Sequence, residues 1–145
     1  MHKTRLLFLC TGNSCRSQMA EGWANHLKSD TIDAFSAGIE KHGLNPLAVE
    51  VMAEAGVDIS YQQSTRIDEL PNINFEWIIT LCGHADESCP VFPGKRFHYG
   101  FDDPPSLAAD AETEEETLQH YRRVRDQIKE FVATLPGSLA NFTEE

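Results

Sequence analysis

Hydrophobic residues follow two patterns along this chain, and the two patterns alternate. Apolar runs, typical of strands buried in a parallel sheet, predict strands over residues 5–10 and 75–81. Two shorter strands are expected over about residues 33–37 and near 96–99. Helical spacing of apolar residues predicts helices over residues 16–28, from Pro46 to a stop at Gly56, and over about 112–135. This order of elements indicates an α/β domain that starts with a βαβ unit.

Each predicted helix carries an apolar face that we expect to be buried. Asn45 is placed to cap the second helix and Pro46 to begin it. Residues 61–74 are polar and contain Pro71, so we expect a mainly irregular connection with one helical turn. The apolar faces consist of Met19, Trp23 and Leu27 in the first helix, Leu47, Val51 and Ala55 in the second, and Leu118, Tyr121, Ile128 and Val132 in the last.

The first predicted strand leads into the first helix through the loop Cys10-Thr11-Gly12-Asn13-Ser14-Cys15-Arg16-Ser17. A strand-to-helix loop of this kind turns successive backbone N–H groups inward and receives the positive end of the helix dipole. A cysteine thiol in that field ionises easily, and an arginine adds a planar, two-pronged grip on an anion with several oxygens. The loop therefore predicts a site for phosphate or an anion of its shape.

Other residues of the loop suit this interpretation. Gly12 allows positive φ or a close approach of the backbone to the anion, and Asn13 tolerates the left-handed region. Ser17 can donate a hydrogen bond to the Cys10 thiolate. Cys15 is expected to be a packed residue that supports the loop, with a redox role as the alternative. If the loop were an ordinary turn, Cys10 would be a buried residue at the end of a strand.

Two other strands are predicted to deliver polar groups to the same edge of the sheet. The third strand ends at Cys82, and the short fourth strand precedes Asp102 and Asp103. In open parallel sheets, ligands bind beyond the carboxyl ends of the strands, so these groups are expected to meet the anion loop. His42, in the loop after the second strand, is a further residue that could reach the site.

Length and composition are those of one small globular domain. The chain has 145 residues, 41% of them hydrophobic, and contains no apolar run near the ~20 residues of a membrane span. A net charge of −11 opposes binding to nucleic acid or to an anionic membrane. Residues 1–5 lead directly into a strand without a cleavage site, so we expect no signal peptide and a cytoplasmic location.

The chain has four cysteines, Cys10, Cys15, Cys82 and Cys89, and is long enough to fold without disulfides. The cysteines therefore indicate reactive thiols more than a structural framework. A zinc site formed by Cys82, His84 and Cys89 is the competing interpretation, although the paired C-x2-C spacing of most zinc sites is absent.

Three segments of the chain resemble one known family. They are CTGNSCRSQMAEGW at residues 10–23, TLCGHADESCP at residues 80–90 and GFDDP at residues 100–104. In order and spacing, over nearly the whole chain, these segments resemble arsenate reductases of the low-molecular-weight tyrosine phosphatase fold. The resemblance implies a single α/β domain in which helices flank a four-stranded parallel sheet.

The resemblance also implies roles for the anion loop and for one acid. Cys10 would be the nucleophile that attacks arsenic, and Arg16 would bind the oxyanion together with the loop residues 11–15. Asp103 would be the general acid that protonates the leaving oxygen, because Pro104 follows it directly as in the family. Arsenate would be the substrate, with phosphate and sulfate as its analogues.

Cys82 and Cys89 are implied to form a thiol relay with Cys10, reduced by thioredoxin in a monomeric enzyme. Glutaredoxin and mycothiol systems serve related enzymes and stay open as alternatives. Reduction of arsenate takes two electrons, which two thiolates can supply by forming a disulfide. If residues 82–89 were helical, the two Cα atoms would lie ~10 Å apart, beyond the ~7 Å limit for a disulfide, so the segment is expected to unwind.

The anion loop alone fits both the phosphatases and the reductases of this fold. The pair of Cys82 and Cys89 favours the reductase, and Pro105-Ser106-Leu107 stands where the phosphatases place tyrosines. The alternative is a low-molecular-weight phosphatase that hydrolyses phosphoesters through a Cys10 phosphoenzyme, with the other two cysteines as a redox lock. A non-enzymatic anion sensor or zinc-binding regulator is the third hypothesis.

Family members of the thioredoxin-linked branch bind potassium near the loop. The residues that do so resemble Asn13, Glu21 and Ser36, together with an aspartate that aligns roughly with Thr65. Because Thr65 lacks that carboxylate, no tightly bound cofactor is expected, and a monovalent cation near the other three residues is the open alternative.

Overall fold

The computed structural model describes residues 3–71, 73–83, 85 and 95–141. Within them, four parallel strands form one sheet in the order β2-β1-β3-β4. The strands are β1 (Thr4–Cys10), β2 (Ile32–Gly38), β3 (Trp77–Thr80) and β4 (Lys95–His98). The predicted α/β domain with a four-stranded parallel sheet is confirmed, and every strand lies close to its predicted place.

Strand β1 occupies the centre of the sheet because its apolar residues are buried from both sides. The side chains of residues 6–9 are completely buried, as the continuous apolar run predicts. β1 pairs with β2 along its whole length, so that Cys10 lies opposite Gly38, and it pairs with β3 on its other side. The loop after β1, Cys82 after β3 and Asp103 after β4 therefore leave the sheet at one edge.

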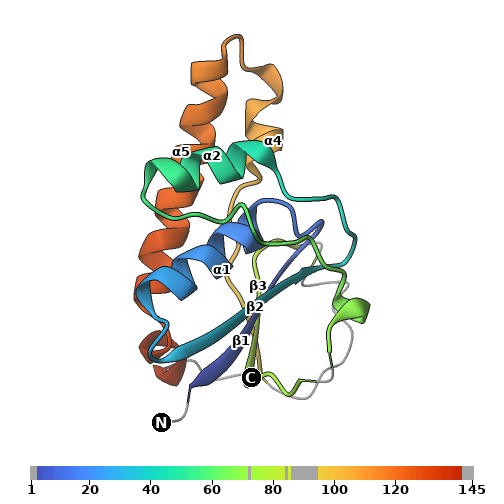
Figure 1. The fold of residues 1–145 in the computed structure, drawn as a ribbon, viewed down its shortest axis with the longest axis vertical. Helices are drawn as coiled ribbons and strands as arrows, with labels where there is room; N and C mark the ends of the chain where they lie inside the picture. The colour runs from blue at the N-terminus through green and yellow to red at the C-terminus, as the bar shows by residue number, and fades with distance from the viewer. Residues whose placement is uncertain (1–2, 72, 84, 86–94, 142–145) are drawn as a thin grey trace.

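Helix α1 (Arg16–Leu27) packs against the long helix α5 (Glu114–Ala133). Figure 1 shows α5 running along one side of the molecule, with α2 (Pro46–Glu54) beside its upper half. Trp23 of α1 donates its indole N–H to the backbone oxygen of Arg125 on α5 over 3.2 Å. The shorter described elements are α4 (Pro104–Leu107), η1 (Ile67–Glu69), η2 (Ala108–Asp110) and η3 (Gly137–Asn141), where η denotes a 3₁₀ helix.

The helix boundaries follow from capping residues. Asn45 caps α2 as predicted, because its side-chain oxygen accepts from the backbone N–H of Leu47 over 2.8 Å. Gly56, with a φ of 85°, follows the end of that helix. α5 begins at Glu114 and not near residue 112, because the Thr113 hydroxyl caps it. None of the described helices has the length and apolar character that crossing a bilayer requires.

Two of the predicted apolar faces need correction. Leu27 is 38% exposed, because it is the last residue of α1 and projects past the packed part of the helix. On α2 the completely buried residues are Ala48, Val51 and Met52, whereas the predicted Leu47 and Ala55 are half-buried at the margins of the face. The face of α5 is confirmed, with Leu118, Tyr121, Ile128 and Val132 all buried.

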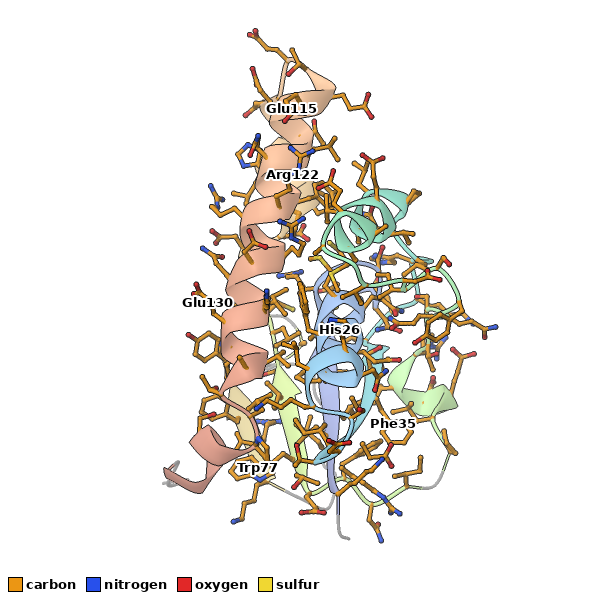
Figure 2. All side chains as sticks on the ribbon, turned by 60° about the vertical axis from the view of Figure 1, so that its left-hand side comes forward. His26, Phe35, Trp77, Glu115, Arg122 and Glu130 are labelled. Atoms are coloured by element: carbon orange, nitrogen blue, oxygen red, sulfur yellow. The ribbon has the colours of Figure 1, made fainter. Side chains whose placement is uncertain are left out.

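Arginines of α5 link that helix to α2, whose first residues border the loop. Arg122 donates two hydrogen bonds of 2.9 Å to the Glu54 carboxylate and one of 2.7 Å to Glu115. Hydrogen bonds from Arg122 hold the pKa of Glu54 below its usual value. Figure 2 shows Glu115 and Arg122 toward the end of α5 that lies away from Trp77. The ion pairs therefore fasten the two helices at the end of the molecule that carries the loop.

Candidate active site

The loop after β1 is shaped by backbone hydrogen bonds to residues 39–45. The carbonyl oxygens of Cys10, Thr11, Gly12 and Ser14 accept from the N–H groups of residues 39, 40, 42 and 45, over 2.8 to 3.2 Å. In a trans peptide the N–H points opposite to the preceding C=O, so the next N–H groups are turned away from this segment. A row of such donors at the start of α1 is an anion-binding arrangement.

A pocket of about 260 Å³ lies over the loop. Asn13 has a φ of 47°, which gives the loop the left-handed residue that the sequence predicted there. Gly12 serves a different purpose from the positive φ considered for it, because a Cβ at this position would fall 2.2 Å from Nδ1 of His42. The pocket is lined by Cys10, Thr11, Gly12, Ser14, Cys15, Arg16, His42, Asp103 and Pro105.

The Cys10 side chain is buried and held by a chain of polar groups. Its Sγ lies 2.8 Å from the Ser17 hydroxyl, as the sequence predicted. Asn13 donates to that hydroxyl over 2.8 Å, and the Asn13 side-chain oxygen accepts from the backbone N–H of Thr65 over 2.7 Å. Because Asn13 occupies a lone pair of the Ser17 oxygen, the hydroxyl proton is available to a Cys10 thiolate. The Cys10 sulfur is therefore held by a chain of hydrogen bonds through Ser17, Asn13 and Thr65.

Arg16 and Asp103 form an ion pair in the wall of the pocket. Arg16 Nη2 lies 3.5 Å from Asp103 Oδ1, and Arg16 Nη1 donates to the backbone oxygen of Phe101 over 3.1 Å. Ser106 donates to the other Asp103 oxygen over 2.7 Å. Asp102 is exposed and does not line the pocket, so the structure favours Asp103 over Asp102 as the acid at the site.

Cys82 lies beside the loop, as the convergence of strand ends predicts. Its side chain is buried, and its Sγ lies 3.2 Å from the Thr11 hydroxyl and accepts from the Ala85 N–H over 3.4 Å. Cys89 and His84 lie outside the described residues, and with them the second half of the relay and the proposed zinc site. Among the described residues, no group of three or more metal-binding side chains is present.

Cys15 is a supporting residue in this arrangement. It is buried, and burial raises the pKa of its thiol far above the usual value, with the charges of Cys10 and Asp103 acting in the same direction. A thiol that stays protonated is a poor nucleophile. The structure therefore favours the packing role over the redox role for Cys15.

The three residues considered for a monovalent cation do come together. Ser36 donates to Glu21 over 2.5 Å and accepts from the Asn13 amide N–H over 3.0 Å. Burial raises the pKa of the Glu21 carboxyl. Asn13 thus presents a donor to this cluster, and its oxygen is bonded to Thr65 and Gln18. Asn13, Glu21 and Ser36 are therefore joined to one another by hydrogen bonds.

Sequence reasoning missed one connection to the loop. The Asn45 side chain donates to the Tyr121 hydroxyl over 3.0 Å, while its backbone N–H donates to the Ser14 oxygen over 3.0 Å. Asn45 therefore joins α5 to the anion loop in addition to capping α2. The available signal was a tyrosine on an apolar helix face, where a buried hydroxyl needs a partner.

A parallel sheet whose first loop presents a hydrogen-bonded cysteine, an arginine and a row of backbone donors defines a class of cysteine-dependent proteins that bind oxyanions. The chain belongs to the low molecular weight phosphotyrosine protein phosphatase family, whose sequence profile matches residues 5–143.

Within this class, the chain is similar to proteins that are named arsenate reductases. An arsenate reductase of Bacillus licheniformis is 56% identical over 134 residues, which cover 90% of this chain and 93% of that protein. A solved arsenate reductase in the phosphate binding state superposes with a TM-score of 0.74 at 32% identity, covering 93% of this chain and 98% of the other. A solved arsenate reductase in the oxidized state gives a TM-score of 0.75 at 31% identity, with coverages of 94% and 98%.

Proposed function

We propose that this protein is an arsenate reductase, which converts arsenate to arsenite. The observation that carries the proposal is the position of Cys82, whose Sγ lies 3.2 Å from the hydroxyl of Thr11, the residue next to Cys10. A phosphoester hydrolase needs one thiolate at its anion site. Two-electron reduction of an oxyanion needs two thiolates that can end as a disulfide. Similarity to arsenate reductases over most of the chain supports the same assignment.

In the first step, the Cys10 thiolate attacks arsenic and forms a sulfur–arsenic bond. The oxygen that leaves takes a proton from Asp103 and departs as water. The dipole of α1 and the Ser17 hydroxyl stabilise the thiolate before the attack. Arg16 and the loop N–H groups hold the remaining oxygens. Arsenic is still As(V) at this point, because replacing an oxygen by a thiolate transfers no electrons.

In the second step, a Cys82 thiolate attacks the Cys10 sulfur. The sulfur–arsenic bond breaks and its electron pair stays on arsenic, so arsenite leaves as As(III) and a disulfide joins Cys10 to Cys82. In the third step, the Cys89 thiolate attacks Cys82, which releases the Cys10 thiolate. Two electrons have then passed from the pair of Cys82 and Cys89 to arsenic, and the anion loop is ready for another cycle.

Formation of the second disulfide requires movement after β3. Gly83 and Ala85 are helical, and a helix over residues 82–89 would keep the two Cα atoms ~10 Å apart. We therefore propose that the helical turn at Gly83 and Ala85 unwinds when the protein is oxidised. Amide exchange at Gly83 and Ala85 should be faster in the oxidised protein than in the reduced protein, and equal protection in the two states would remove this step.

We propose thioredoxin as the reductant and the cytoplasm as the place of action. A protein disulfide is reduced by a dithiol, and an internal third cysteine makes a small-molecule thiol unnecessary. The proposed reaction starts from reduced cysteines, the state that the cytoplasm maintains. A monomer suffices for the proposed chemistry, because residues of one chain line the pocket. Arsenate-dependent NADPH oxidation with thioredoxin, compared with glutaredoxin, tests the reductant.

We propose that the hydrogen-bonded cluster of Asn13, Glu21 and Ser36 supports the loop in place of a resident monovalent cation. The cluster already satisfies the polar atoms that a cation would need. Thermal unfolding in potassium chloride and in tetramethylammonium chloride at equal ionic strength should give the same midpoint. A midpoint raised specifically by potassium would overturn this proposal.

Turnover by the wild type and by a Cys82→Ser variant tests the reductase against the phosphatase. A reductase should oxidise NADPH through thioredoxin when arsenate is added, and the variant should lose this activity while retaining the anion pocket. A phosphatase should hydrolyse p-nitrophenyl phosphate rapidly in both proteins and release no arsenite. Weak hydrolysis by the wild type is compatible with the reductase, because both reactions use one loop.

A further inference from the structure

Glu40 and His42 form a pair at the rim of the anion pocket. The backbone N–H of Glu40 donates to the Thr11 oxygen over 2.8 Å, and that of His42 donates to the Gly12 oxygen over 3.0 Å. Residues 40–42 are therefore joined to the anion loop by backbone hydrogen bonds. His42 is one of the residues that line the pocket, and the chemistry described so far assigns it no role.

The imidazole of His42 has a defined orientation. Its Nε2 lies 2.8 Å from Oε1 of Glu40, and a carboxylate can only accept, so Nε2 carries a hydrogen. The other nitrogen, Nδ1, lies over the loop, because a Cβ added to Gly12 would fall 2.2 Å from it. The absence of a side chain at Gly12 thus leaves room for this ring edge against the loop.

We propose that His42, held by Glu40, is a second side-chain ligand of the oxyanion beside Arg16, and that it binds in its protonated form. This inference deepens the proposed function and rests on it for the identity of the oxyanion. With both ring nitrogens protonated, Nε2–H donates to Glu40 and Nδ1–H donates to an arsenate oxygen. A charge-assisted hydrogen bond of this kind is stronger than one from a neutral donor.

The charges around the ring decide its protonation. On its own segment, Glu40 favours the imidazolium, whereas Lys41 is paired with Glu69 over 3.0 Å. Across the pocket, Arg16 disfavours the imidazolium, while its partner Asp103, the Cys10 thiolate and a bound dianion favour it. A donor at both ring nitrogens requires the imidazolium, so the proposed contact with the oxyanion should weaken as the pH rises.

A purely structural role for the pair is a weak explanation. The side chains of His42 and Glu40 are 51% and 58% exposed, and ion pairs this exposed contribute little to stability. Substitutions at either position should therefore leave the protein folded. Their effect should be seen in oxyanion affinity and in its pH dependence, which folding alone does not change.

The test compares His42→Gln and Glu40→Gln with Lys41→Gln, a control on the same segment whose side chain pairs with Glu69. The dissociation constant of inorganic phosphate and the KM and kcat of arsenate reduction are measured at about pH 6 and about pH 8.5. Because arsenate and phosphate also titrate, each variant is compared with the wild type at the same pH.

His42→Gln should raise the phosphate dissociation constant and the arsenate KM about tenfold at the lower pH. At the higher pH, the dissociation constant and the KM of the variant should approach those of the wild type. The kcat should change less than the KM. Glu40→Gln should give a smaller effect of the same sign, and Lys41→Gln none. A ratio that is equal at the two pH values, or equal for His42→Gln and Lys41→Gln, would overturn the proposal. If phosphate binding follows this pattern but no arsenite forms, the proposed reaction is wrong, whereas the proposal that His42 binds the oxyanion is supported.

Discussion

The two sulfur atoms at the pocket are held in very different ways. Cys10 Sγ is hydrogen-bonded to Ser17, which is itself bonded to Asn13, and Asn13 is bonded to Thr65. Within the described residues, Cys82 Sγ has two such contacts, the Thr11 hydroxyl at 3.2 Å and the Ala85 N–H at 3.4 Å. Both sulfurs are buried, but one belongs to a braced loop and the other to the turn after a strand.

The difference matches two kinds of chemical work. A thiolate that receives a tetrahedral anion in every cycle gains from donors that are already in place, since reorganising them would raise the barrier. A sulfur that must pass from one partner sulfur to another has to move, because disulfide geometry leaves little tolerance. In the proposed mechanism, the loop after β1 keeps its shape and the turn after β3 moves.

The largest effect should come from removing the fixed sulfur. Cys10→Ala should lower arsenate reduction by at least about 10³-fold, because loss of a nucleophile leaves only the binding contribution to catalysis. Cys15→Ala in the same loop keeps its backbone N–H and should lose far less activity. Initial rates of arsenite release measure both. Equal losses in the two variants would contradict the separate roles given to these cysteines.

A side chain added against the loop after β1 should destabilise the protein more than one added in the turn after β3. A Cβ at Gly38 would lie 2.4 Å from the Glu40 backbone oxygen and 2.6 Å from the Asn13 nitrogen, and backbone atoms cannot turn aside. Gly38→Ala should therefore reduce the free energy of unfolding by about 1–3 kcal/mol. Gly83→Ala, where none of the described residues lies within 4 Å of the added Cβ, is the matched control and should stay within about 0.5 kcal/mol. Urea unfolding of both variants checks the contrast, and similar losses would refute it.

Removing the Ser17 hydroxyl beside the Cys10 sulfur should have a smaller effect than these changes. Ser17→Ala removes the 2.8 Å contact to Cys10 Sγ and also leaves the Asn13 amide without that acceptor. The alkylation of Cys10 by iodoacetamide at neutral pH should slow about tenfold, as expected for the loss of a hydrogen bond to a charged group. Peptide mapping follows the modified cysteine. An unchanged rate would mean that Ser17 does not stabilise the thiolate.

The smallest effect should be a change in how stability depends on pH. Burial raises the pKa of Glu21 in the folded protein, so the folded state binds this proton more tightly than the unfolded chain. Its stabilising contribution is complete below the usual glutamate pKa and is lost as the pH rises through the raised value. Relative to Glu21→Gln, the wild type should therefore lose stability as the pH rises above the usual glutamate pKa of about 4. A difference between the two proteins that stays constant as the pH rises would contradict the shift.

The cradle could be predicted from sequence because its residue types are demanding. A continuous apolar strand, a left-handed residue at Asn13, and a cysteine and an arginine with five residues between them leave few alternatives. The backbone bonds from residues 39–45 to the loop carbonyls could not be predicted, because they use groups that every residue carries. Leu27 was placed inside by periodicity, which carries no information about where the sheet beneath a helix ends.

The proposed reaction requires two electrons to pass from Cys82 and Cys89 to the arsenic that is bound at Cys10. Mass spectrometry of the wild type after one turnover with arsenate and without reductant measures this directly. We predict one equivalent of arsenite, a disulfide between Cys82 and Cys89, and Cys10 and Cys15 recovered as free thiols. Arsenite released while all four cysteines stay reduced, or a disulfide between Cys10 and Cys15, would contradict it.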